Sequence, residues 1–163
     1  MRTALLAVLL LAAGLIYAKE AKVDFSGEWV FNEEKSEMGE GRGRMLASSL
    51  VVTQGAEKIS IERTGERRNG ETYTTSDEIT LDGAENELEG FRGSVRTVTA
   101  QWDEEGTTLT ISSKMTFERD GNTMEFTSTE VWSMTEDGSL KIHSTRQTRR
   151  GESVSILVYD KKE

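Results

Sequence analysis

The sequence predicts an all-β protein, an antiparallel up-and-down meander that closes into a barrel of eight or nine strands. Short segments of alternating polar and apolar residues follow one another from Phe25 almost to the C-terminus, and glycine-centred turns separate them. No interval between the segments is long enough for the helical crossover that parallel strands need. Closure into a barrel is the arrangement that removes the exposed edges of such a sheet.

Five strands are expected in the first two thirds of the chain. They cover approximately residues 25–31, 48–54, 58–64, 71–81 and 93–103. Residues 32–47 lack a clear pattern and hold at most one short helix, with Met38, Met45 and Leu46 as its apolar content. An acidic segment, residues 82–90, is expected to be a loop because it lacks an alternating run.

The last four strands allow a prediction of register. They carry residues 109–117, 124–134, 140–146 and 154–158. A two-residue Asp120-Gly121 turn, the pair that a type I′ hairpin prefers, would place Phe117 opposite Met124 and Leu109 opposite Trp132. Turn chemistry and hydrophobic pattern predict the same register here, which makes this hairpin the firmest element of the interpretation.

Two further loops extend the register to the end of the chain. The segment Glu136-Asp137-Gly138 places a glycine at the left-handed position of a three-residue loop and pairs Trp132 with Ile142. A similar loop at residues 149–151 would pair Arg146 with Val154. In this register Val154, Ile156 and Val158 face the barrel interior.

The N-terminal residues have the pattern of a secretory signal. Arg2 supplies a positive charge, residues 4–16 form an apolar run, and Ala18 completes a small-residue cleavage site. The run is shorter than the roughly 20 apolar residues of a membrane span. The predicted organisation is a signal peptide at 1–18, a lead-in segment at 19–24 and one β-barrel domain at 25–160, exported to the periplasm or the extracellular space. An uncleaved anchor is the alternative reading.

Composition excludes several classes of function. The chain carries 29 acidic and 20 basic residues, and this acidic balance argues against nucleic acid and anionic membranes as partners. There are no cysteines to form a disulfide. The only histidine, His143, is expected on the outward face of its strand, and no metal-ligand, nucleophile or phosphate-loop spacing is found. We therefore expect no metal, no cofactor and no catalytic residues.

The first predicted strand resembles the start of a known family. Residues 25–29, Phe-Ser-Gly-Glu-Trp, are similar to the Gly-x-Trp beginning of the lipocalin and fatty-acid-binding-protein (calycin) superfamily, and residues 25–36 resemble small exported bacterial lipocalin-like proteins. The resemblance implies a barrel in which Trp29 closes one end and a small apolar molecule occupies the interior. The family's arginine that packs over this tryptophan would be Arg146, Arg149 or Arg150. The chain departs from typical lipocalins in lacking their disulfide and the helix after the barrel.

Polar residues on the predicted inward face are the candidate ligand-binding residues. Ser113 falls opposite Ser128 and Glu130 opposite Ser144, with Arg146 diagonal to Glu130. Buried charges need partners or ligands, and an arginine is suited to bind an anionic group through two hydrogen bonds. Further candidates for the ligand site are Arg96, Arg63, Trp132 and Trp29, with the tryptophans stacking on the ligand.

Three functions remain open from the sequence. The first is an exported barrel that binds a small hydrophobic or amphipathic ligand, including an anionic one. The second is a ligand-free structural or interaction module of the cell envelope, in which Glu130 and Arg146 form an internal ion pair in a filled barrel. The third is a barrel-cavity enzyme using Glu130 as acid or base, and we rank it below the other two.

Overall fold

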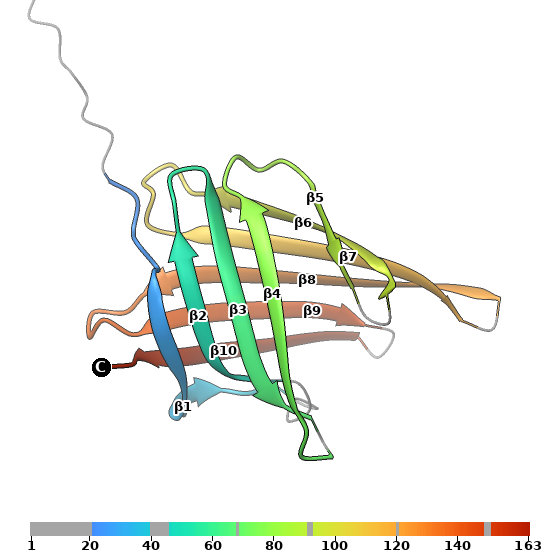
Figure 1. Ribbon diagram of the computed structural model, residues 1–163, viewed down its shortest axis with the longest axis horizontal. Coiled ribbons are helices and arrows are strands. Elements are labelled where there is room, and N and C mark those ends of the chain that lie inside the picture. The colour runs from blue at the N-terminus through green and yellow to red at the C-terminus, as the bar shows by residue number, and fades with distance from the viewer. Residues whose placement is uncertain (1–20, 40–45, 68, 91–92, 120, 149–150) are drawn as a thin grey trace, which may run out of the picture.

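The structure, a computed structural model, describes residues 21–39, 46–67, 69–90, 93–119, 121–148 and 151–163 as one antiparallel sheet (Figure 1). The strands are β1 (Gly27–Glu37), β2 (Ala47–Gln54), β3 (Lys58–Glu66), β4 (Thr72–Thr80), β5 (Asn86–Glu89), β6 (Val95–Trp102), β7 (Leu109–Arg119), β8 (Asn122–Met134), β9 (Leu140–Thr148) and β10 (Gly151–Lys161). The described residues contain no α-helix. The predicted signal peptide lies outside the described residues.

The sheet curls into a nearly closed barrel, in which the first strand joins the N-terminal strands to the last strand of the chain. β1 pairs with β2 and with β10, so the strand order is β4-β3-β2-β1-β10-β9-β8-β7-β6-β5. β4 and β5 are the two edges, and side chains join them. Asn86 at the start of β5 donates from Nδ2 to the Thr80 hydroxyl at 3.2 Å. We call this β4–β5 junction the seam.

The predicted fold class is confirmed, and the strand count differs slightly. The described chain has ten strands rather than eight or nine, since β5 lies within the acidic segment that was expected to be a loop. Four residues are too few to establish an alternating pattern. Where a short helix was allowed, β1 continues to Glu37 through an irregularity after Asn32. Residues 40–45 of that stretch lie outside the described part.

Two of the three predicted registers are confirmed and the third is wrong. Phe117 pairs with Met124, Leu109 with Trp132, and Trp132 with Ile142. Between β9 and β10, however, Arg146 pairs with Ser153 and not with Val154. A shift of one residue moves every side chain of a strand to the opposite face.

The corrected register changes what β10 contributes to the interior. The side chains that share the face of its buried core residues alternate along the strand: Ser153, Ser155, Leu157 and Tyr159. The inner face of β10 therefore begins with two serines, whereas the predicted register had placed three aliphatic residues there. The barrel wall next to β9 is therefore more polar than expected.

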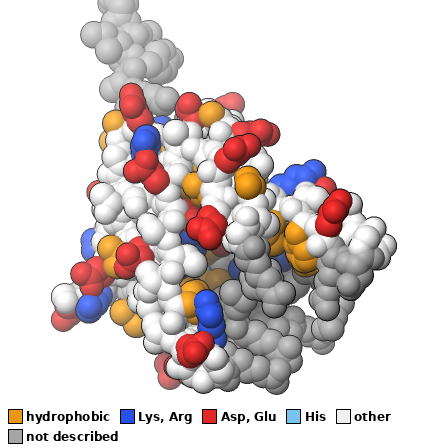
Figure 2. Space-filling model, turned by 45° about the vertical axis from the view of Figure 1, so that its right-hand side comes forward, with side chains coloured by type: hydrophobic (Ala, Val, Ile, Leu, Met, Phe, Trp, Pro, Cys, Tyr) orange, Lys and Arg blue, Asp and Glu red, His pale blue; other side chains and the backbone are white. Residues whose placement is uncertain are grey.

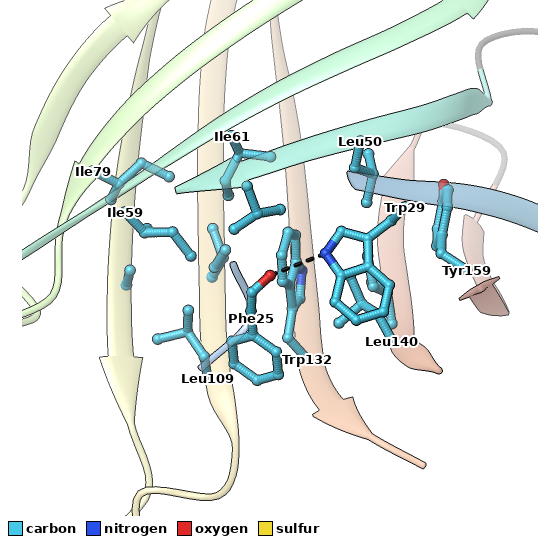
Figure 3. Packing of buried hydrophobic residues seen from close by; sticks show 14 of the residues in the cluster. Phe25, Trp29, Leu50, Ile59, Ile61, Ile79, Leu109, Trp132, Leu140 and Tyr159 are labelled. Carbon is cyan, nitrogen blue, oxygen red and sulfur yellow. Dashed lines mark hydrogen bonds between the residues drawn. The ribbon is translucent and has the colours of Figure 1, made fainter. Parts of the chain in front are cut away.

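Aromatic residues fill the end of the barrel where the described chain begins (Figure 3). Phe25 is fully buried, stacks on Trp102 with ring centroids 5.6 Å apart, and meets Trp132 edge-on at 5.9 Å. The indole N–H of Trp29 donates to the Phe25 carbonyl at 3.0 Å. We call this the closed end. Large aromatic side chains dominate the stability of such a core, and here they pack the closed end of the barrel.

The described chain has no helix with the length and apolar character required to cross a membrane.

Candidate functional site

Four charged side chains form a continuous network across the barrel interior. The guanidinium of Arg63 on β3 donates to Asp77 on β4 and to Glu130 on β8, both at 3.0 Å. Asp77 also accepts from Arg96 on β6, which joins the two sides of the seam. The indole N–H of Trp132 donates to Glu130 at 3.0 Å. We call Arg63, Asp77, Arg96 and Glu130 the interior ion network.

The network balances two positive charges against two negative ones. Burial alone would raise the pKa of Glu130, but the charge of Arg63, the hydrogen bond from Trp132 and the charge of Arg146 outweigh it and lower the pKa. Burial likewise disfavours the charged form of Arg63, and the two carboxylates more than compensate, so its pKa is raised. Both shifts favour the charged forms of Glu130 and Arg63, and the network pairs two cationic side chains with two anionic ones.

Beyond the network the inner face becomes more accessible, and we call this half the open end. Side chains at most 5% exposed form the closed-end core on β7 and β8, whereas their inward continuations toward the β7–β8 turn are only half-buried: Ser113, Met115, Phe117, Met124, Phe126 and Ser128. Figure 2 shows the surface hollowed on this side of the molecule, with hydrophobic side chains visible in the hollow. Among the described residues, the inward-facing side chains of the open end are thus more accessible than those of the closed end.

Arg146 is the cation of the open end. It follows Ser144 on the inward face of β9, lies opposite Ser128 and Ser153, and is exposed. Its guanidinium makes no hydrogen bond or ion pair with the part of the chain that the structure describes. Arg63 and Arg96, by contrast, are both engaged with Asp77. An inward-facing arginine with free donors is suited to a carboxylate or similar anion.

Tyr73 on β4 contributes a hydroxyl to the same region. Burial raises its pKa, while Arg146, Arg63 and Arg67 act in the opposite direction, so Tyr73 and Arg146 lie within electrostatic reach of each other. Its ring is seated on Gly65 of β3, where an added Cβ would lie 2.7 Å from the Tyr73 hydroxyl oxygen. The absence of a side chain at Gly65 allows this placement.

The structure brings the predicted polar residues together as the register implied. Ser113 lies opposite Ser128, and Glu130 opposite Ser144. The predicted internal ion pair is wrong in its partner, however, since Glu130 is bonded to Arg63 and not to Arg146. Arg96 belongs to the network through Asp77. Whether any of these residues binds a ligand stays a prediction.

The two predicted tryptophans lie in the closed end. Trp29 and Trp132 are at most 1% exposed, so they are core residues in the structure as it stands. The cation over the Trp29 ring is Lys161, 5.7 Å from the ring centroid, and Arg63 lies 6.0 Å from that of Trp132. Arg146 does not take this place. The other two arginines considered for it, at 149 and 150, lie outside the described residues.

Sequence reasoning missed Asp77, Tyr73 and Tyr159. Asp77 is 5% exposed and holds the network together, but the run around it alternates too weakly to indicate which residues face inward. Tyr159 became an inward residue only with the corrected β10 register, and its hydroxyl donates to the Ala47 carbonyl at 3.1 Å. The signal that could have indicated Tyr73 is its place four residues before Asp77, on the same face of one strand.

No cluster of potential metal ligands is found among the described residues. His143 is exposed, as its predicted outward position requires. The described side chains of the site supply ion pairing, hydrogen bonding and apolar contact.

The nearly closed antiparallel barrel is the fold that the resemblance to lipocalin-like and fatty-acid-binding (calycin) proteins implied. Among solved structures the chain is similar to zebrafish ileal bile acid-binding protein in complex with cholic acid, with a TM-score of 0.53 and 16% sequence identity. The match covers 85% of this chain and 98% of the zebrafish chain. No family model and no curated protein sequence matches the chain.

Proposed function

We propose that this chain is an exported barrel protein that binds a small amphipathic anion in its open end. The observation that carries the proposal is Arg146, an inward-facing guanidinium without a partner among the described residues, beside an ion network that pairs two cationic side chains with two anionic ones. Among the described inward-facing residues Arg146 therefore adds one positive charge at the accessible end of the barrel, which a ligand with a single anionic group would balance.

The binding mechanism divides between charge and desolvation. Arg146 would hold the anionic group through paired hydrogen bonds, and the Tyr73 hydroxyl would supply a further donor from the opposite wall. The apolar part of the ligand would leave water for the half-buried surface of the open end. Each buried methylene contributes about 0.8 kcal/mol, so a short apolar body brings the affinity into the micromolar range.

The ionised, ion-paired carboxylate of Glu130 favours binding over catalysis as the function. A general acid at neutral pH needs a raised pKa, whereas the pKa of Glu130 is lowered and its carboxylate is bonded to Arg63. The zebrafish protein of the same fold is a bile acid-binding protein that was crystallised with cholic acid. That precedent supports a ligand that combines an acid group with an apolar body.

Export is the second part of the proposal and is supported by the N-terminal pattern alone. The charged start, the apolar run and Ala18 are typical of a cleaved signal. N-terminal sequencing of the protein recovered from its host is expected to begin at Lys19. A protein recovered with Met1 intact would contradict this part and leave the binding proposal to be judged by itself.

A ligand-free envelope module is the competing function, because the ion network needs no guest and the closed end is packed with aromatic side chains. Native mass spectrometry of the protein purified from its host, followed by solvent extraction, separates the two. Binding predicts a reproducible bound mass that extraction removes and that is acidic and lipophilic. A single apo mass, together with failure to bind an added fatty-acid probe, would favour the envelope module.

A further inference from the structure

The β7–β8 hairpin extends beyond both of its neighbours. β6 pairs with β7 only as far as Met115, and β9 pairs with β8 only as far as Thr127. Within the described part of the chain, the strand pairing of the outer residues, 116–119 and 122–126, is with each other. In Figure 1 this hairpin reaches furthest from the barrel, at the right of the view. We call this outer segment the arm.

The arm has one apolar and one polar face. Phe117 and Phe126 stack with ring centroids 5.4 Å apart and planes 3° from parallel. Met124, opposite Phe117, lies on the same face, and Met115 at the base of the arm continues it. The other face is polar: Thr116, Glu118, Thr123 and Glu125. An isolated two-stranded hairpin is marginally stable in water, so a half-exposed aromatic face on one calls for a partner.

We propose that the apolar face of the arm is the subsite for the apolar body of the ligand. The inference rests on the proposed function and adds an orientation to it. The anionic group would lie at Arg146 and the body would run outward along the arm, away from the closed end. The ligand class is then a monoanionic amphiphile with an elongated apolar body, in contrast to a neutral lipid buried deep in the barrel.

The arm subsite is supported by an unbroken inner face that leads from Arg146 to the arm. Arg146 is opposite Ser128, and the next inward residues of β8 toward the arm are Phe126 and Met124. Four residues of strand span about 14 Å, which sets the length of apolar surface next to the guanidinium. In the other direction lie the ion network and the aromatic core, where Trp132 is fully buried. The arm is thus the apolar surface that a molecule held by Arg146 can reach.

The side chains of the arm suit a ligand of variable shape. Methionine is flexible and polarizable and fits irregular apolar surfaces, and the parallel phenyl rings present a flat area beside it. A second copy of the chain or a membrane could also cover such a face. A second copy would not need the cation at the base of the arm, and the net charge of -9 disfavours an anionic membrane, which is why we favour the ligand.

Methionine methyl NMR tests the orientation directly. The protein, labelled at its methionine methyl groups, is titrated with cis-parinaric acid, an anionic lipid probe. Met115 and Met124 are expected to shift on binding, whereas Met134, which packs against the closed-end core, serves as the internal control and stays in place. Probe binding that shifts Met134 but leaves Met115 and Met124 unchanged would overturn the inference and keep the proposed function.

A pair of variants on the arm gives an independent measure. Phe117→Ser is expected to weaken probe binding about tenfold, since it removes a half-buried ring from the contact surface. Thr116→Ser, the neighbouring position on the polar face, is the matched control and should bind like the wild type. Equal affinity of both variants would contradict the arm subsite, as would methyl shifts that follow protein concentration without probe. A wild type that binds no probe would overturn the proposed function together with the inference.

Discussion

Arg63 on β3 and Glu130 on β8 lie far apart in the sheet and meet across the barrel interior at 3.0 Å. The same guanidinium binds Asp77, which in turn accepts from Arg96 on β6. The network thereby fixes the distance between opposite walls and bridges the seam where no backbone ladder exists. It also lies between the buried aromatic core of the closed end and the half-buried side chains of the open end.

Removing the central cation should destabilise the barrel. In Arg63→Met, the remaining donor to Glu130 among the described residues is Trp132, and Asp77 retains Arg96, so the partly buried Glu130 carboxylate loses its counter-ion. We expect a loss of about 2 kcal/mol in the free energy of unfolding, less than for fully buried pairs because Arg63 is 21% exposed. Urea unfolding followed by tryptophan fluorescence measures it. Arg67→Met, at an exposed position, is the control, and an equal effect of the two variants would argue against a structural network.

Loss of the hydroxyl should affect stability differently at two facing serines. Ser144 and Ser155 pair across β9 and β10 and are both buried. Ser155 accepts from the backbone N–H of Gly39 at 3.0 Å, whereas the Ser144 hydroxyl makes no hydrogen bond with the described residues. Ser144→Ala is expected to be neutral or stabilising, and Ser155→Ala to cost about 1 kcal/mol. Thermal unfolding compares them, and a larger loss at Ser144 would indicate a partner for its hydroxyl.

Filling the space at Gly65 should displace Tyr73. A Cβ there would lie 2.5 Å from the Leu46 carbonyl oxygen and 2.7 Å from the Tyr73 hydroxyl. Gly65→Ala is expected to cost about 1–3 kcal/mol and to weaken binding of an anionic probe. At Gly55 the nearest contact is an ordinary 3.5 Å, so Gly55→Ala is the matched control. Unchanged stability in Gly65→Ala would show that the ring and the adjacent chain can move aside.

The Asp160 carboxylate on the outer surface should make the stability of the fold depend on pH in the acid range. Lys35, Asn32 and Ser139 donate to the Asp160 carboxylate and hold its pKa at about 2, below its ordinary value of 3.8. The unfolded chain therefore takes up this proton first as pH falls, and the stabilisation is present above about pH 4 and lost toward pH 2. Lys35→Met removes the largest cause, so its melting temperature should fall less steeply between those limits. Lys141→Met, at an exposed position of β9, should keep the wild-type slope.

The strand register could be predicted from the sequence where the turn residues and the hydrophobic alternation agreed. The β7–β8 register followed from the turn at Gly121, whose φ is +72°, together with the apolar alternation on both strands. The β8–β9 loop followed in the same way from Gly138, with φ +81°. In both cases the turn residues and the flanking pattern specified one pairing, and the inward positions of Ser113 and Glu130 came with it.

The same reasoning failed at β10 for a physical reason. Val154, Ile156 and Val158 look like an inward face, but Val154 is 42% exposed while Ser155 is buried. Val158 is buried on the outer face, where its backbone N–H donates to Ser36 in the irregular part of β1 at 2.9 Å. A strand covered on its outer side does not alternate cleanly, so its phase cannot be deduced from hydrophobicity.

The centre of the candidate site depends on contacts across the barrel. Arg63 and Glu130 are 67 residues apart, and their meeting depends on the curvature of the whole sheet. Strand alternation indicates which residues face inward but not which ones meet across the interior. The sequence therefore indicated a polar strip with an arginine, and it assigned Glu130 the wrong cation.

The central claim is that Arg146 binds the anionic group of an amphipathic ligand. Titration of cis-parinaric acid into the wild type, Arg146→Ala and Lys141→Ala tests it most directly, since Lys141 is an exposed cation on the same strand. We predict micromolar binding by the wild type and by Lys141→Ala, and a loss of about tenfold or more in Arg146→Ala, as for removal of a charge-assisted bidentate contact. Equal affinity of Arg146→Ala and the wild type, or no binding by the wild type, would contradict the claim.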